Sequence, residues 1–258
     1  MPLRQSSKQY LGAGVDTATL PRSAILKRCW IEWAVVGFGL PAVTSGLAKL
    51  VDWTVPAAQH GSVSQRFLLH VSGGIAGEWL FILALKFVLT RRKQSLRGLG
   101  TWRAGTSSAW VLALLFAGVS IASNIRFLPR MHIPIVNAFL PHGFHLLAAL
   151  AMGLTAGFCE EVLFRGFLMT EFALAGFGRF MQIFLPGVAF GFAHVGYSVH
   201  GFVAGVGIML PTGLLGMIWG AAYLLGRRSL LPCIVAHFVN DATALPWIMF
   251  FMFTGSLG

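Results

Sequence analysis

Apolar residues occur in seven long runs that are separated by short polar or basic stretches. The runs lie at about 30–48, 67–90, 108–125, 144–172, 180–202, 204–226 and 229–254. A helix needs about 20 apolar residues to cross the hydrocarbon core of a bilayer. The pattern therefore predicts an all-α fold, a polytopic transmembrane bundle with seven spans, or eight if Pro211 or Pro232 divides one of them.

Composition supports this class and excludes others. Of the 258 residues, 56% are hydrophobic and only 10% are charged, whereas a soluble domain carries about 25% charged residues. The net charge of +11 would favour nucleic-acid binding in a soluble protein. In a membrane protein it is typical of the basic loops that fix orientation, so we expect no nucleic-acid partner.

The distribution of Lys and Arg predicts the orientation. With the N-terminus in the cytoplasm, thirteen of these residues fall on the cytoplasmic side and four on the opposite side, as the positive-inside rule requires. We expect an integral protein of a bacterial inner (cell) membrane. Three parts are predicted: a cytoplasmic tail at 1–28, two accessory transmembrane helices with a basic loop at 29–107, and a core at 108–254.

Six ionisable residues lie near the middle of three C-terminal apolar runs. A charged side chain at the bilayer centre costs at least about 2.5–3.5 kcal/mol, so such residues are usually functional. Because three helices bring polar groups to the same depth, the pattern predicts one buried site. Its members are Glu160, Glu161, Arg165, His194, His237 and Asp241.

Helical spacing relates these residues to glycines that allow close packing. Glu160 lies three and seven residues after Gly157 and Gly153, and His194 stands in the same relation to Gly191 and Gly187. On α-helices each polar residue shares the close-packing glycine face, where the two polar residues can meet.

Two further pairs have the i, i+4 spacing of helical neighbours. We interpret Glu161–Arg165 mainly as a structural ion pair, and His237–Asp241 as a pair on one face of the last span.

A carboxyl group and histidines in an apolar cavity suit the activation of water. Cys29, Cys159 and Cys233 are far apart, with no metal-binding spacing, and are interpreted as packed free thiols. For the remaining membrane residues we favour hydrogen bonds between helices, although Glu78 is also near mid-span and could face an aqueous cavity. These residues are Glu32, Glu78, His142, His145 and His200.

Three ordered motifs resemble the CPBP (ABI) family of intramembrane glutamic endopeptidases, which includes type II CAAX prenyl endopeptidases. They are EExxxR at 160–165, FxxxH at 190–194 and HxxxN/D at 237–241, and the resemblance covers roughly 108–245. It implies a helical membrane protease with a water-accessible cavity and no required metal or other cofactor.

The resemblance also implies roles for individual residues. Glu160 would activate water with help from His194, and His237 and Asp241 would stabilise the oxyanion. Glu161 and Arg165 would shape the first motif, and Phe190 would pack beside the second. The family often has Asn at the last position, where this chain has Asp241 preceded by Asn240. An ionised Asp241 cannot donate a hydrogen bond, so it is either protonated or orients His237.

The resemblance implies a membrane-anchored or lipidated protein or peptide as the substrate, in contact with the bilayer. Two alternatives stay open. A zinc protease would use Glu160, His194 and His237 as ligands, although the chain has no HExxH motif. A non-enzymatic membrane scaffold, immunity protein or transporter is the other alternative; transporters usually have internal repeats, which this sequence does not show.

Overall fold

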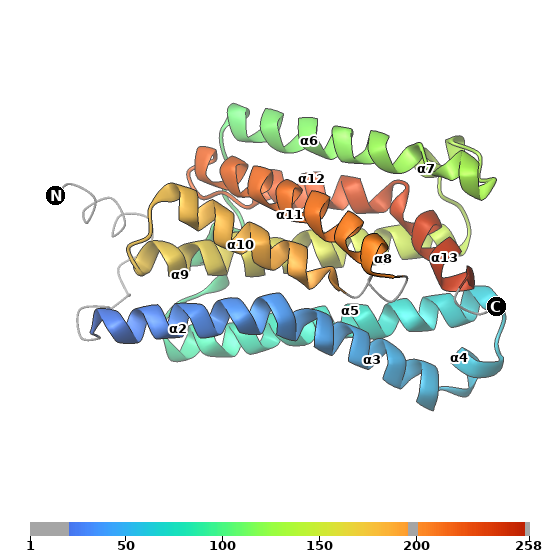
Figure 1. Cartoon of the computed structure of the whole chain (residues 1–258), viewed down its shortest axis with the longest axis horizontal. Helices are drawn as coiled ribbons and strands as arrows, with labels where there is room; N and C mark the ends of the chain where they lie inside the picture. Colours follow the sequence, from blue (N-terminus) through green and yellow to red (C-terminus); the bar gives the residue numbers. More distant parts are fainter. Residues whose placement is uncertain (1–20, 196–200, 256–258) are drawn as a thin grey trace.

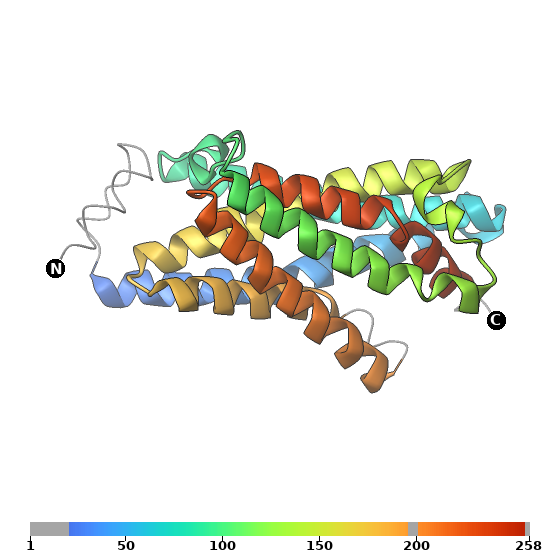
Figure 2. The same cartoon turned by 90° about the horizontal axis from the view of Figure 1, so that it is seen from above.

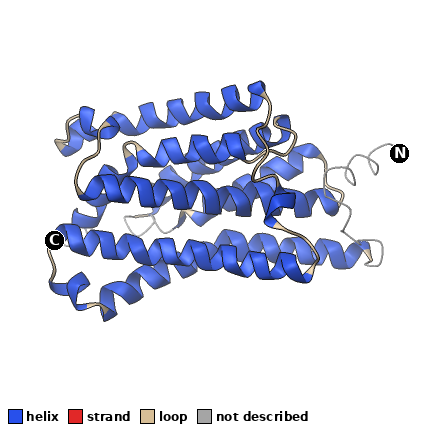
Figure 3. Cartoon of the chain, turned by 180° about the vertical axis from the view of Figure 1, so that it is seen from behind, coloured by secondary structure: helices blue, strands red, loops and turns tan. Residues whose placement is uncertain are grey.

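A computed structural model describes residues 21–195 and 201–255, and within these ranges every regular element is a helix (Figure 3). The N-terminal helices are α2 (Arg22–Ala34), the π-helix η2 (Val35–Gly39), α3 (Leu40–Thr54), α4 (Pro56–His60), α5 (Val63–Arg91) and the 3₁₀ helix η3 (Leu96–Leu99). The next are α6 (Ser107–Ile125), the 3₁₀ helix η4 (Leu128–Met131), α7 (Val136–Phe139), α8 (Phe144–Glu160), the π-helix η5 (Glu161–Leu168) and α9 (Met169–Leu174). The last are α10 (Arg179–Ala193), α11 (Phe202–Leu225), α12 (Leu231–Ala242) and α13 (Leu245–Gly255).

The predicted all-α class is confirmed, but the expected seven or eight spans are not. In the described residues five helical stretches are long and apolar enough to cross a membrane, and a sixth exists if α12 and α13, bent by 49°, form one span. The segment expected at 180–202 contains α10, which has 15 residues and reaches only about 22 Å at 1.5 Å per residue. Its helix ends at Ala193, and residues 196–200 lie outside the described part. The five stretches are 22–54, 63–91, 107–131, 144–174 and 205–225.

The helices run roughly along the long axis of the molecule, with α8 in the middle (Figure 1). α8 packs against α5 on one side and α12 on the other, α12 and α11 pack against α6, and α10 packs against α11. In the most apolar 18-residue part of the 144–174 stretch 61% of the residues are buried, compared with 17–33% in the corresponding parts of the other four spans. Figure 2 shows that α11 crosses the bundle obliquely. The most buried helix therefore carries the first motif.

Glycines bring these helices into close contact. A Cβ atom added to Gly157 would lie 3.0 Å from the carbonyl oxygen of Ile234 in α12, and one added to Gly191 would lie 2.7 Å from that of Met209 in α11. The predicted close packing is present. Each glycine face packs against a different neighbour, α12 for α8 and α11 for α10.

An ion network joins the N-terminal helices to α9. Glu171 of α9 accepts from Arg28 of α2 at 2.7 Å and from Arg92, just after α5, at 3.2 Å. Arg92 also pairs with Glu32 of α2. Residues 22–28, expected in the cytoplasmic tail, belong to α2, and residues 1–20 of that tail lie outside the described residues.

Candidate active site

The chain changes helical form at the first motif. Glu160 is the last residue of α8 and Glu161 is the first of the π-helix η5. π-helical turns are rare and occur frequently at functional sites. Arg165 Nη1 donates to Glu161 Oε1 at 2.8 Å, and the two side chains are 1% and 0% exposed. The predicted contact between Glu161 and Arg165 is therefore present, fully buried.

Arg165 has partners beyond Glu161. Its Nη2 donates to the carbonyl oxygen of Gly216 in α11 at 3.3 Å. Its guanidinium carbon lies 4.2 Å from the centre of the Phe190 ring and 5.6 Å from that of Trp219. A cation over aromatic faces is stabilised by their negative quadrupole. Arg165 thus holds η5, α10 and α11 together beneath the polar cluster.

His237 of α12 lies among three carboxyl groups. Its Nδ1 is 2.8 Å from Glu161 Oε1, and its Nε2 is 3.3 Å from Asp241 Oδ2 and 3.7 Å from Glu160 Oε2. The first and third motifs, 76 residues apart in sequence, therefore meet in space. Glu161, rather than Glu160, is the closer partner of His237.

Asp241 and Asn240 form a hydrogen-bonded pair. Asn240 Nδ2 donates to Asp241 Oδ1 at 2.8 Å, while Asp241 Oδ2 faces His237. Asp241 therefore accepts on one oxygen and faces a ring nitrogen with the other. This arrangement suits a carboxylate that orients His237.

His194 follows the last residue of α10, where the backbone leaves the helix. Its Nδ1 lies 2.9 Å from the carbonyl oxygen of Phe190. Phe190 contacts His194 and His237 edge to face, with ring centres 5.1 and 5.9 Å away. His194 is close enough to Glu160 to interact with it electrostatically, so the second motif reaches the same site.

Two neighbours of the site were not among the predicted site residues. Trp219 of α11 lies 4.8 Å from His237, ring centre to ring centre; an apolar residue in an apolar helix gives no sequence signal. Glu78 of α5 interacts electrostatically with Glu160, His237 and Asp241. Its position near the middle of the span is the sequence signal for a place in the site. From the sequence alone we favour a hydrogen bond between helices for Glu78, with an aqueous cavity as the alternative.

The other polar residues of the described spans lie in separate contacts. Glu32 belongs to the ion network, His145 stacks on Trp247 with ring centres 3.5 Å apart, and His142 lies 5.7 Å from the same ring. His200 lies outside the described residues. In the described ranges no three His, Cys, Asp or Glu side chains are arranged to hold a metal ion. The three cysteines are buried free thiols.

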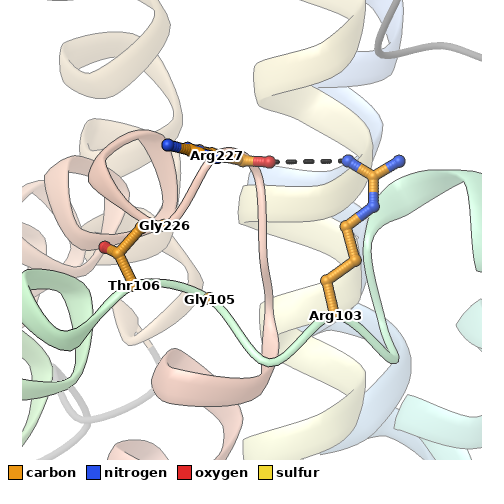
Figure 4. Close-up of a pocket in the computed structure, with 5 residues that line it drawn as sticks. All are labelled: Arg103, Gly105, Thr106, Gly226 and Arg227. Carbon is orange, nitrogen blue, oxygen red and sulfur yellow. Dashed lines mark hydrogen bonds between the residues drawn. The ribbon is translucent and has the colours of Figure 1, made fainter.

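A cavity of about 270 Å³ lies away from the polar cluster, between the loop that precedes α6 and the loop that joins α11 to α12 (Figure 4). Arg103 Nη1 donates across it to the carbonyl oxygen of Arg227 at 3.4 Å. The residues that line it are Arg103, Gly105, Thr106, Gly226 and Arg227. None of them belongs to the three motifs.

Comparison with known proteins agrees with the motifs. Residues 141–243 match the family described as type II CAAX prenyl endopeptidase Rce1-like. No curated protein and no solved structure matches the chain. The matched segment includes α8, η5, α10 and α12, and so contains all three motifs. Residues 141–243 of this integral membrane protein are therefore similar to the type II CAAX prenyl endopeptidases, which supports the CPBP resemblance of the three motifs.

Proposed function

We propose that this protein is an intramembrane glutamic endopeptidase that cleaves a lipidated or membrane-anchored peptide near its membrane segment. The observation that carries the proposal is the meeting of Glu160, Glu161, His237 and Asp241 within a helical segment of the CAAX-protease-like family. Water activation requires a base that can reach water. The Glu160 side chain keeps 12% exposure, while its Oε2 atom is buried and accepts no hydrogen bond within the structure.

In the proposed reaction Glu160 removes a proton from water while the water oxygen attacks the scissile carbonyl carbon. The carbon–nitrogen bond of the resulting tetrahedral intermediate then breaks, and Glu160 returns the proton to the leaving amine. His194 helps to hold the water. Nδ1 of His237 stays engaged by Glu161, and its Nε2, which faces Asp241 at 3.3 Å before the reaction, turns its donor to the oxyanion as negative charge develops there.

Asp241 acts through His237 in this proposal. As an ionised acceptor it cannot donate to an oxyanion, but it can fix the orientation of the imidazole and stabilise its charged form. Glu161 does the same from the other nitrogen, and Arg165 compensates the charge of Glu161. The site then relies on no metal ion.

Replacing Glu160 by Gln tests the proposal. Gln keeps the size and polarity of the side chain but cannot accept the proton, so cleavage of a prenylated peptide in detergent or vesicles should fall by at least about 10²-fold. Unfolding temperature checks that the variant is folded, and the same peptide without its lipid checks the substrate class. Parent activity should persist in the presence of a chelator.

Full activity of a folded Glu160→Gln variant would contradict the assignment of the base. Loss of parent activity in chelator, restored by zinc, would favour the metal-dependent alternative. Failure of the parent protein to cleave any lipidated peptide would contradict the proposed function.

A further inference from the structure

A carboxyl group at the position of Glu78 is energetically unfavourable. It lies near the midpoint of α5, a 29-residue apolar span, where an isolated charge costs several kcal/mol unless it is paired or faces a polar site. Its Oε2 atom is buried and accepts no hydrogen bond within the structure. A simple helix-to-helix hydrogen bond through that atom therefore does not account for it.

The contacts of the next residue place Glu78 beside the first motif. Trp79 Nε1 donates to Thr155 Oγ1 of α8 at 3.3 Å, and the Trp79 ring stacks on Phe158 with centres 5.8 Å apart. Phe158 is two residues before Glu160 on the same helix. The packing of α5 against α8 therefore places Glu78 beside the last turns of α8, which end at Glu160.

The electrostatic neighbours of Glu78 agree with this placement. Glu78 interacts electrostatically with Glu160, His237 and Asp241, and also with Cys159, which precedes Glu160. Four carboxyl groups then share the region with Arg165 and two histidines. Arg165 compensates Glu161. In a low-dielectric interior like charges repel one another strongly, so Glu78 and Glu160 influence each other's charge.

We propose that Glu78 is a positioning residue of this active site, which acts through Glu160 by setting where the shared protons of the carboxyl cluster reside. This inference deepens the proposed function, and the catalytic role of Glu78 rests on that function. Glu78 lies on an accessory helix outside the segment 141–243 that matches the family. The N-terminal helices would then contribute to the chemistry as well as to packing.

A double-mutant cycle tests the coupling without any substrate. The unfolding temperature is measured for the parent, Glu78→Gln, Glu160→Gln and the double variant. Each single change removes the same repulsion, so the shift of the double variant should differ from the sum of the single shifts by about 2–4 °C. Leu83→Gln combined with Glu160→Gln is the control, since Leu83 lies on α5 but is 59% exposed, and it should give additive shifts.

Additive shifts for Glu78 and Glu160 would overturn the inference, whatever the protein's activity. Should Glu78→Gln fail to fold, Glu78→Met, which has a similar length and suits the bilayer, takes its place in the cycle. If the parent cleaves no lipidated peptide, the proposed function fails while the cycle still decides whether the two carboxyl groups are coupled.

Kinetics separate a charge effect from a packing effect. We expect Glu78→Gln to lower kcat by roughly tenfold, as for outer partners of catalytic groups, with KM unchanged, and Glu78→Asp to keep most of the activity because it keeps the carboxyl group. A purely structural role predicts the reverse order, since Gln keeps the shape and Asp is one methylene shorter. Unchanged kcat in folded Glu78→Gln, alongside an inactive Glu160→Gln, would refute the inference and leave the protease intact.

Discussion

Arg165 is the residue on which the charge balance of the site depends most directly. It is 1% exposed, it pairs with Glu161 at 2.8 Å, and Glu161 in turn binds His237 at 2.8 Å. A buried ion pair need not add stability by itself, because desolvation offsets the attraction. Removing one partner is different, since it leaves the other charge buried and unpaired.

Arg165→Ala should therefore lower the free energy of unfolding by about 3–5 kcal/mol, measured by thermal unfolding in detergent. Glu160→Gln should cost much less, because the contact of Glu160 with His237 Nε2, at 3.7 Å, is longer than a hydrogen bond. The double change Glu161→Gln with Arg165→Met should recover part of the loss, because both charges are then removed. An Arg165→Ala variant as stable as the parent but inactive would instead place Arg165 in direct contact with water or substrate.

Sequence spacing predicted some of these contacts and missed others for a physical reason. The i, i+4 rule gives Glu161–Arg165 and His237–Asp241, and both pairs are present. It cannot give the contact of His237 with Glu161, which depends on how α12 is rotated against η5. The π-helix that begins at Glu161 changes the angular phase of every later residue, and residue types alone do not reveal it.

At the scale of elements, contact between α8 and α12 brings the first and third motifs together. Gly153 and Gly157 let the two backbones approach, and a Cβ at Gly157 would lie 3.0 Å from the Ile234 carbonyl oxygen and from the Phe238 nitrogen. Neither neighbour is the end of a flexible side chain. The sequence predicted this close-packing face, but not which helix it would meet, because glycine spacing carries no information about the partner.

Gly157→Ala should push α8 away from α12 and so separate Glu160 and Glu161 from His237. We expect a loss of about 1–3 kcal/mol in stability, as for other overpacked interiors, together with a larger loss of kcat than of substrate affinity. Gly118→Ala on α6 is the matched control, because a Cβ there meets nothing within 4 Å and alanine favours helix. Equal stability and equal kcat of the two variants would show that the site does not depend on the close approach of α8 to α12.

At the scale of the whole molecule, basic residues gather at one end of the bundle. The start of α2, the end of α5, the turn between α9 and α10 and the loop between α11 and α12 all lie there (Figures 1 and 2). The opposite end carries the α3–α4–α5 connection and fewer basic residues. The basic residues of the first end are Arg22, Lys27, Arg28, Arg91, Arg92, Lys93, Arg97, Arg103, Arg179, Arg227 and Arg228.

The positive-inside rule assigns the basic end to the cytoplasm, and cysteine labelling tests that assignment. Ser23→Cys lies at the basic end and His60→Cys at the opposite end, and both positions are exposed. The three native cysteines are buried and give little background. A membrane-impermeant maleimide added to intact cells should label His60→Cys alone, and Ser23→Cys should react only after the membrane is opened. The reverse labelling pattern would show that the protein has the opposite orientation in the membrane. The soluble part of a substrate would then reach Glu160 from the opposite side.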